Sequence, residues 1–384
     1  DAPAIRFKGF SDAWEQRKVG DLLIERNQQA PMSDEYPLMA FIANEGVAPK
    51  GERYDRSALV TDTVNKLYKK TEKGDFIYSS NNLETGSIGL NKYGKACISP
   101  VYSIFEPTGI ADSDFLGRRL VRKDFINAMV KWRQGVIYGQ WRIHESDFLK
   151  IEITVPSVEE QRKIGAYLDQ LDNLITLHQR KFEKLTNVKK SMLEKMFPQN
   201  GSSYPEIRFK GFTDPWEQRK AKELCNIGTG KSNTQDQVEN GLYPFYIRSD
   251  IPVKSNKYLY DCEAVITIGD GNIGRVFHYV NGKFDLHQRC YKMTDFQDIW
   301  GKYFYYFFST RFYDRAMKMT AKATVDSVRL EMISEMDIWK PIQIDEQKKI
   351  AEFFTNLDNL ITLHQRELEK LQNIKKSMLE KMFV

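Results

Sequence analysis

Apolar side chains recur at intervals of three and four residues along two long stretches of the chain, residues 156–198 and 342–384. In the first stretch, the recurring positions are Leu168, Leu171, Ile175, His178, Phe182 and Leu185. In the second stretch, they are Leu357, Ile361, His364, Leu368 and Leu371. A spacing that averages about 3.5 residues predicts two long helices that pair along this seam as a coiled coil. The alternative is two separate surface helices, each packed on its own domain.

The first long helix has a recognisable start, because Ser157 and Glu160 follow Pro156 with the spacing of a capping box. A helix of about 40 residues is about 60 Å long. Antiparallel pairing of two such helices about a local two-fold axis would bring His178 and His364 together near the middle. The pair is then either a metal- or pH-sensitive site or a polar seam position that sets the register. The absence of a third ligand favours the second interpretation.

Two blocks of sequence occur twice in the chain. Residues 5–18 and 207–220 are identical at 12 of 14 positions, and residues 160–197 and 346–383 are identical at 27 of 38. The stretches between these blocks differ from each other. A repeated frame around two divergent inserts predicts two equivalent domains that present different surfaces.

Each divergent insert combines short strand patterns with a helix pattern. Runs of β-forming residues between glycine-containing turns predict strands at residues 75–80, 96–105, 258–260, 264–268 and 275–279. Helices are predicted at residues 113–133 and 298–318, and return strands at residues 151–155 and 338–344.

These elements predict an α+β fold with two globular domains joined by two long helices that form an antiparallel coiled coil, with pseudo-two-fold symmetry. The predicted boundaries are residues 1–155 for the first domain, 156–198 for the first helix, 199–341 for the second domain and 342–384 for the second helix.

The repeated blocks carry a resemblance to a known family. It rests on the lead-ins FKGF-x-D-x-W-EQRK at residues 7–18 and 209–220, on the helix entries that begin at Glu160-Gln161 and Glu346-Gln347, and on the SMLEKMF endings. Over essentially its full length, the chain resembles the specificity subunit of a type I restriction–modification system.

The resemblance implies a DNA-reading role. Each insert would be a target-recognition domain that binds one half-site of double-stranded DNA, and the helices would be spacers that dock two methyltransferase subunits. Restriction/translocase subunits would be further partners. S-adenosylmethionine, ATP and Mg²⁺ would belong to these partners, with no cofactor in this chain. Because the inserts differ, the DNA site would be asymmetric and split by an unread gap. The chain would direct adenine methylation or restriction by its partners at this site.

Charge is unevenly distributed along the chain, whose net charge is +5. Residues 20–155 hold 18 basic and 18 acidic side chains, and residues 221–340 hold 16 and 15, so neither insert is basic overall. Basic side chains nevertheless cluster before each long helix, with an aromatic interleaved. The candidates for phosphate contact are Arg118, Arg119, Arg122, Lys131, Arg133, Tyr138, Arg315, Lys318 and Lys322. The alternative for each of them is an ordinary solvated helix face.

Base reading requires side chains that match the edges of bases, such as arginine for guanine and asparagine or glutamine for adenine. In the first insert, the candidates are Asn81, Asn82, Gln140 and Arg142. In the second insert, they are Arg248, Ser249, Asn272, Arg275 and Arg289.

Motifs for catalysis are missing from the sequence. An adenine methyltransferase would carry an Asn/Asp-Pro-Pro-aromatic stretch and a common nuclease pattern begins with Pro-Asp, and neither occurs. The pattern G-x-G-x-x-G at residues 269–274 is followed by a strand-like run rather than a helix, so it predicts a turn and not a dinucleotide site. His287 and Cys290 alone do not make a zinc site. We therefore expect no catalytic and no metal-binding residue, and a non-catalytic subunit.

The cysteine pattern and the hydropathy bear on location. Four cysteines without a C-x-x-C pair, and no signal-peptide pattern, predict free thiols in the reducing cytoplasm. No run of about 18 apolar residues occurs, so we expect no membrane partner. The sequence begins at Asp1 rather than methionine, and we expect further residues to precede it.

Two other function classes compete with DNA reading. One is a coiled-coil adaptor protein without sequence-specific DNA binding, whose two domains bind proteins. The other is a stand-alone DNA enzyme, which the missing motifs disfavour.

Overall fold

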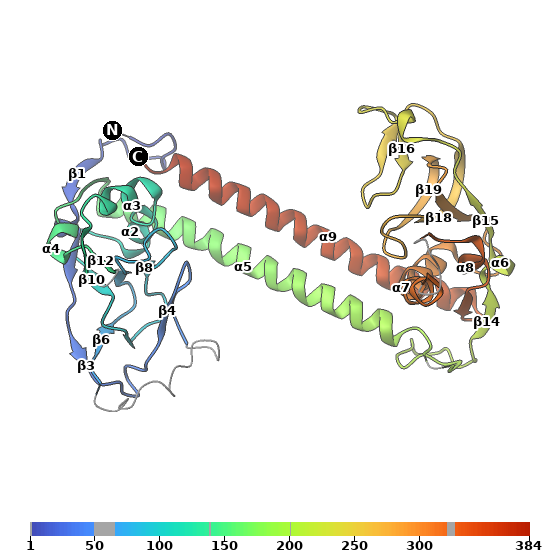
Figure 1. Ribbon diagram of the computed structural model, residues 1–384, viewed down its shortest axis with the longest axis horizontal. Coiled ribbons are helices and arrows are strands. Elements are labelled where there is room, and N and C mark those ends of the chain that lie inside the picture. The colour runs from blue at the N-terminus through green and yellow to red at the C-terminus, as the bar shows by residue number, and fades with distance from the viewer. Residues whose placement is uncertain (1, 50–65, 138–139, 200, 321–326) are drawn as a thin grey trace. The chain divides into compact units, whose positions relative to one another are not determined.

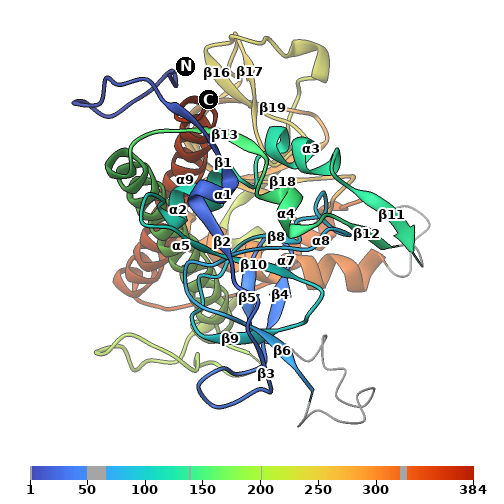
Figure 2. The same ribbon diagram turned by 90° about the vertical axis from the view of Figure 1, so that its left-hand side faces the viewer.

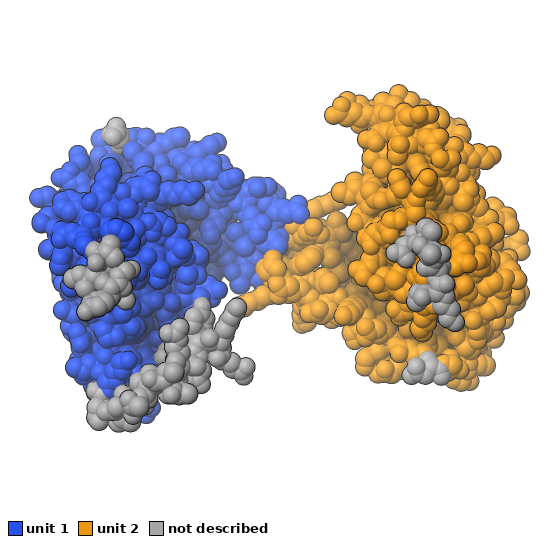
Figure 3. All heavy atoms as spheres, in the orientation of Figure 1, with its two compact units in different colours: residues 1–177, 368–384 blue, residues 178–367 orange. Residues whose placement is uncertain are grey.

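The computed structural model describes residues 2–49, 66–137, 140–199, 201–320 and 327–384. It divides into two compact units, unit 1 (residues 1–177 and 368–384) and unit 2 (residues 178–367) (Figure 3). Each unit combines an α+β domain with one end of each long helix. The long helices have 38 residues each and are α5 (Val158–Lys195) and α9 (Ile344–Lys381) (Figure 1).

The long helices run antiparallel within each unit. In unit 1, Leu168 near the start of α5 shares a hydrophobic cluster with Leu371 near the end of α9. In unit 2, Leu185 near the end of α5 shares a cluster with Leu357 near the start of α9. The predicted antiparallel pairing of two long helices is therefore confirmed.

The seam positions occupy the covered side of both helices. Leu168, Leu171 and Leu357 are buried. The remaining seam positions are half-buried, namely Ile175, His178, Phe182, Leu185, Ile361, His364, Leu368 and Leu371. Leu174 and Leu177, which lie between seam positions of α5, are exposed. The spacing of about 3.5 residues thus separates a packed face from an open one on the same helix.

Unit 1 is built from short strands. The strands are β1 (Glu15–Lys18), β2 (Leu23–Glu25), β3 (Gln29–Ala30), β4 (Ala40–Ile42), β5 (Gly46–Ala48), β6 (Tyr68–Thr71), β7 (Phe76–Tyr78), β8 (Ile88–Leu90), β9 (Ala96–Ile98), β10 (Ser103–Pro107), β11 (Gln134–Ile137), β12 (Gln140–Arg142) and β13 (Glu152–Val155). They form a four-stranded sheet in the order β2-β10-β7-β8, a three-stranded sheet β3-β6-β9, and the pairs β1-β13, β4-β5 and β11-β12. The β11–β12 hairpin projects from the side of this unit (Figure 2).

The helices of unit 1 differ from the prediction in one respect. They are α1 (Val19–Leu22), α2 (Ser113–Arg119), α3 (Lys123–Val130) and α4 (Glu145–Phe148). The single helix predicted over residues 113–133 is therefore wrong, because the backbone of Arg122 is extended. This break keeps Leu120 buried and lets the Arg122 guanidinium donate a hydrogen bond to the carbonyl of Leu379.

Unit 2 contains a larger sheet. Its strands are β14 (Glu217–Lys220), β15 (Asn226–Thr229), β16 (Tyr243–Tyr246), β17 (Val253–Ser255), β18 (Tyr260–Ile268), β19 (Phe277–Leu286), β20 (Cys290–Thr294) and β21 (Asp337–Lys340). Its shorter helices are α6 (Ala221–Leu224), the 3₁₀ helix η3 (Thr234–Asp236), α7 (Gly301–Thr320) and α8 (Leu330–Ser334). The sheet order is β15-β20-β18-β19-β16-β17, and β14 pairs with β21. The strand predicted at residues 258–260 is not a separate element, whereas the run after residues 269–274 is a strand as predicted.

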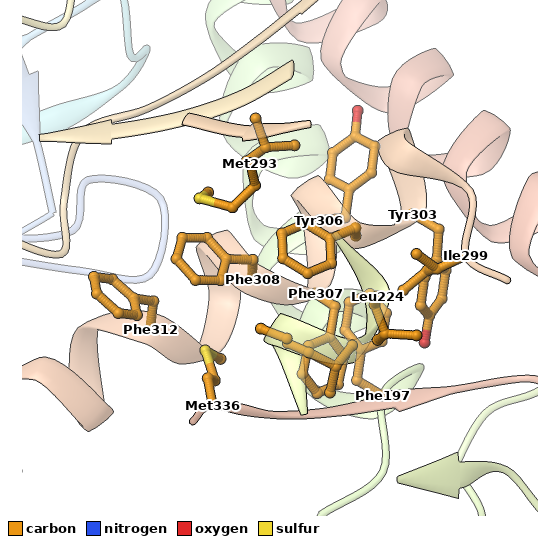
Figure 4. Close-up of a cluster of buried hydrophobic side chains, with 14 of the residues drawn as sticks. Phe197, Leu224, Met293, Ile299, Tyr303, Tyr306, Phe307, Phe308, Phe312 and Met336 are labelled. Carbon is orange, nitrogen blue, oxygen red and sulfur yellow. The ribbon is translucent and has the colours of Figure 1, made fainter. Parts of the chain in front are cut away.

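The sheet of unit 2 separates two hydrophobic clusters. Val265 and Met293 face the main core, where α7 packs, and Ala264 and Ile266 face a second cluster on the other side of the sheet. Figure 4 shows the main core, in which Phe197 lies beside Phe307 of α7. Residues 196 and 197 follow α5, so the end of this helix is part of the core of unit 2.

The repeated lead-ins tie each domain to both long helices. In unit 1, Arg6 donates two hydrogen bonds to Glu160 of α5, at 2.9 and 2.7 Å, and the Ile5 amide donates to the carbonyl of Lys381 in α9. Unit 2 repeats these contacts with the second copy of each block, through Arg208 with Glu346 and Ile207 with Lys195. Identical residues thus make identical joints, which explains why the two blocks repeat together.

The capping box expected at the start of α5 forms only in part. The Ser157 hydroxyl accepts a hydrogen bond from the Glu160 amide at 3.4 Å, but the Glu160 carboxylate binds Arg6 instead of the cap. The adjacent Gln161 binds the carbonyl of Pro156 and the amide of Asp112, which is the N-cap of α2. Glu160 and Gln161 therefore attach the start of α5 to its domain.

Candidate nucleic-acid interface

In unit 1, the loop after β7 and the β11–β12 hairpin form one polar surface. The Asn81 side-chain oxygen accepts a hydrogen bond from the Trp141 amide at 2.6 Å, and the Ser80 hydroxyl accepts one from the Ile143 amide at 3.0 Å. Arg133 donates to both carboxylate oxygens of Glu84 at 2.7 Å. These contacts hold the loop against the hairpin, although the two segments lie far apart in the sequence.

Several side chains of this region are open to solvent. Asn82 is exposed, the Arg142 side chain is 68% exposed, and Trp141 is exposed with the Arg133 guanidinium 5.9 Å from its ring centroid. We call Asn81, Asn82, Arg133, Trp141 and Arg142 the Asn81 surface. It offers amide and guanidinium donors beside an aromatic ring, a combination suited to base edges and base stacking.

Besides Arg133, three further arginines of the predicted phosphate cluster of unit 1 have partners within the protein. Arg118 donates to Asp169 at 2.6 Å and to Asp172 at 2.9 Å, both on α5. Arg119 is buried and donates to Asp124 at 2.8 Å, and Arg122 binds the end of α9. Burial lowers the pKa of Arg119. The placement of these three side chains supports attachment of the domain to the helices rather than phosphate contact.

The remaining candidates of unit 1 are placed as follows. Lys131 is exposed at the C-terminal end of α3. Tyr138 and the side chain of Gln140 lie outside the part of the chain that the structure describes.

In unit 2, three loops meet at one carboxylate. Asp270 follows β18, Arg248 follows β16 and Arg289 precedes β20. Arg289 Nη1 donates to Asp270 Oδ2 at 2.7 Å, and Arg248 Nη1 lies 3.2 Å from each carboxylate oxygen. We call Arg248, Ser249, Asp270, Asn272 and Arg289 the Asp270 surface.

The Asp270 surface is open to solvent but held in place. Asn272 is exposed, and the Arg248 and Arg289 side chains are 44% and 62% exposed. The pKa of Asp270 is lowered, because hydrogen bonds from Arg289 and Arg248 outweigh the opposing effect of burial. Asp270 therefore stays ionised and binds both guanidinium groups.

The other candidates of unit 2 contact α7, lie on it or follow it in the chain. Arg275 donates to the Tyr313 hydroxyl at 2.7 Å and stacks over its ring at 4.6 Å. Arg315 donates to the carbonyl of Met332 at 2.7 Å, which gives it a structural contact, whereas Lys318 is exposed. Lys322 lies outside the described residues.

The two surfaces follow the same plan in the fold. In each unit, a polar loop follows a central strand, and a segment that follows the domain helices returns to bind it. Trp141 makes this return contact in unit 1, and the Val328 amide donates to the carbonyl of Gly269 in unit 2. Sequence reasoning missed Trp141 and Asp270, although Asp270 lies in the same glycine-rich turn as the candidate Asn272.

Metal-binding clusters are not found in the described ranges. No group of three or more His, Cys, Asp or Glu side chains there could hold a metal ion. The four cysteines are free, and burial raises the pKa of Cys225 and of Cys290 to about 12, so that both stay protonated thiols. None of the helices in the described ranges has the length and apolar character that a membrane span requires.

The sequence of this chain matches a known protein family and several known proteins. A family model described as the type I restriction modification DNA specificity domain matches residues 11–187 and again residues 213–373. The type I restriction enzyme MjaVIII specificity subunit of Methanocaldococcus jannaschii is 22% identical over 404 residues, which cover 95% of this chain and 91% of that protein. The putative type I restriction enzyme MjaX specificity subunit of the same organism is 21% identical over 265 residues, which cover 63% of this chain and 60% of that protein.

The fold has a counterpart among solved structures. The crystal structure of the S subunit of the type I restriction–modification system of M. genitalium matches with a TM-score of 0.66 and 14% identity, over 100% of this chain and 99% of that one. At this identity the likeness concerns the fold alone, but the family model covers most of the chain, once in each half. The chain therefore belongs to the family of type I restriction–modification DNA specificity subunits.

Proposed function

We propose that this chain binds an asymmetric, two-part DNA site, with one half-site for each α+β domain, and directs adenine methylation or restriction by partner subunits. One observation carries the proposal. The joints between domain and helices are the same in both units, whereas the polar loops in equivalent places carry different side chains. Two equivalent frames with different reading surfaces suit two different half-sites.

The chemistry of the two surfaces supports direct reading of bases. The Asn81 surface offers side-chain amides and the exposed Arg142, which suit adenine and guanine respectively in the major groove. The Asp270 surface offers two arginines and Asn272. Lys131 and Lys318 are exposed and suited to phosphate contact, which adds affinity but little sequence information.

Partner docking has a candidate surface in each unit. Leu174 and Leu177 of α5 are exposed in unit 1, and Leu360 and Leu363 occupy the equivalent positions of α9 in unit 2. Leucines three residues apart are neighbours on a helix surface, and a contiguous exposed apolar patch marks a site of protein contact. Two equivalent leucine pairs support the proposal that two methyltransferase subunits bind, one to each unit.

The reaction chemistry would reside in these partners. We assign S-adenosylmethionine to the methyltransferase subunits and ATP with Mg²⁺ to restriction/translocase subunits, and we assign no catalytic residue to this chain. The cytoplasm is the proposed place of action, which agrees with the free cysteines.

The test is methylome sequencing of cells that express this chain together with its methyltransferase partner. We expect one split, asymmetric motif, and we expect exchange of residues 221–340 for those of another family member to change one half of it. The competing function is a coiled-coil adaptor without sequence-specific DNA binding. It predicts that no methylated motif depends on this chain.

A further inference from the structure

Arg248 and Arg289 are held differently from the arginines that tie the domains to the long helices. Many other guanidinium groups are attached to the body of the domain or to the long helices, as Arg118 is. The Arg248 and Arg289 side chains are 44% and 62% exposed, yet one carboxylate, Asp270, binds both. A long side chain that is exposed and also fixed has already lost part of the conformational entropy that binding would cost.

The carboxylate itself is firmly positioned by the backbone around it. The Gly269 amide donates to the carbonyl of Arg289 at 2.7 Å, and the Val328 amide donates to the carbonyl of Gly269 at 2.7 Å. The Arg289 amide in turn donates to Nδ1 of the buried His287 at 3.1 Å. Asp270 and Arg289 therefore stand on two backbone segments that are bonded to each other.

The third loop is anchored as well. The carbonyl of Ser249, next to Arg248, lies 3.1 Å from Nε2 of His278 in β19. Asp270 thus holds the guanidinium of Arg248, and the sheet holds the backbone beside it through Ser249.

The hydrogen bonds to Asp270 leave one edge of each guanidinium available. Both arginines use Nη1 for Asp270, and among the described residues neither Nε nor Nη2 of either arginine has a hydrogen-bond partner. The Nε–Nη2 edge carries two parallel donors, which match O6 and N7 of guanine in the major groove. A carboxylate behind the guanidinium orients this edge without occupying it.

We infer that Arg248 and Arg289 form a guanine-reading site for the half-site of unit 2, in which Asp270 is the positioning residue. The inference rests on the proposed DNA-reading function and deepens it, because it assigns a base to named side chains. Two arginines on one carboxylate lie close together, so they read neighbouring base pairs. The half-site of unit 2 therefore contains guanine at one or two adjacent positions, on either strand.

The experiment uses the full chain in complex with its methyltransferase partner. The motif is first determined by methylome sequencing, and methylation rates are then measured on duplexes in which each base pair of both half-sites is changed singly. The variants are R248Q, R289Q, D270N and D270E. The control is R219Q, because Arg219 forms an ion pair with Glu223 at 2.6 Å and is 42% exposed, but lies on β14 away from the three loops.

We expect R289Q and R248Q each to lose about ten- to hundredfold discrimination at one G·C pair of the unit 2 half-site. D270N should weaken discrimination at the same positions together, and D270E, which keeps the charge, should retain more of it than D270N. Preferences in the other half-site should stay within about twofold, and R219Q should leave every preference unchanged.

The outcomes separate the inference from the proposed function. If no motif depends on this chain, the proposed function fails. If the motif exists but its unit 2 half lacks guanine, or if R248Q and R289Q leave every preference unchanged, the inference fails and the proposed function stands. Equal loss at all positions in D270N, without a change in relative preference, would assign Asp270 a purely structural role. If D270N fails to fold, the R248Q and R289Q variants still test the inference, because both side chains are exposed.

Discussion

The Nδ1 atoms of His178 and His364 lie 3.1 Å apart, with ring centroids separated by 5.1 Å. The two rings, one on α5 and one on α9, meet edge to face within unit 2. A hydrogen bond between two ring nitrogens requires one donor and one acceptor, so at least one ring must be neutral at Nδ1. The pKa of His364 is lowered, first by burial and then by the charges of His178 and Lys181. The His178–His364 pair therefore has the features of both interpretations: it is a polar contact between the two helices, and its stability depends on pH.

This pair predicts a pH dependence of helix pairing. Because folding lowers the pKa of His364, the unfolded chain takes up its proton first as the pH falls through 6.5. Stability is thus fully present above that value and is lost progressively as the pH drops toward the lower pKa of the folded state. Thermal unfolding between pH 8 and pH 5 should show a falling midpoint in the wild type and a flatter profile in H364Q. H144Q, at an exposed histidine of unit 1, is the control and should keep the wild-type slope.

The exposed leucines predict where methyltransferase subunits dock. The double variant L174D/L177D should remove one partner subunit from the purified complex, and L360D/L363D should remove the other. Bulk placed on the same exposed face at Asn173 should weaken the first contact in the same way. The measurement is the mass of the complex by light scattering. Because these side chains are exposed, thermal unfolding of the chain alone should change little, and an intact complex in both variants would contradict the assignment.

Phe197 and Phe383 occupy equivalent positions of the repeat. We expect truncation of either one to lower the free energy of unfolding by a similar amount, each in its own unit. Phe197 is fully buried and lies 5.3 Å from Phe307 between ring centroids, and Phe383 is 5% exposed and lies 5.2 Å from Phe115 (Figure 4 shows the first of these pairs). Truncation to alanine should cost about 3–5 kcal/mol in each case. Hydrogen exchange should show F197A loosening unit 2 and F383A loosening unit 1. V384A, next to Phe383 but exposed, should change the free energy of unfolding by less than about 0.5 kcal/mol.

We expect substitution of Arg118 to affect stability and substitution of Arg142 to affect DNA reading. R118Q removes the charge that bonds Asp169 and Asp172, and should lower the free energy of unfolding of unit 1 by about 1.5–3 kcal/mol. R142Q removes an exposed side chain, and should leave unfolding unchanged while weakening discrimination at one position of the first half-site by about tenfold. Urea unfolding and methylation of singly substituted duplexes measure the two effects. A shift in base preference in R118Q alone would reverse these assignments.

Much of this architecture follows from local pattern. The 3.5-residue spacing of Leu168, Leu171 and Ile175 is a property of neighbouring residues, and a helix turns it directly into a packed face. The repeat also predicted two equivalent domains, because identical blocks such as those containing Arg6 and Arg208 make identical joints. The break between α2 and α3 was not predictable in this way, since the partner that Arg122 reaches there, the carbonyl of Leu379, is distant in the sequence.

The sequence by itself therefore determined the two long helices, their seam, the two-domain organisation and the family, all of which depend on spacing and repetition. Only the tertiary structure decided which arginines face solvent. Arg118 and Arg142 look alike along the chain, but the carboxylate of Asp169 lies 51 residues from Arg118 and binds it. In the same way, Asp270 gathers arginines that stand 22 and 19 residues away. Charge pairing depends on distance in space, and that distance is set by the packing of the whole domain rather than by neighbours in the chain.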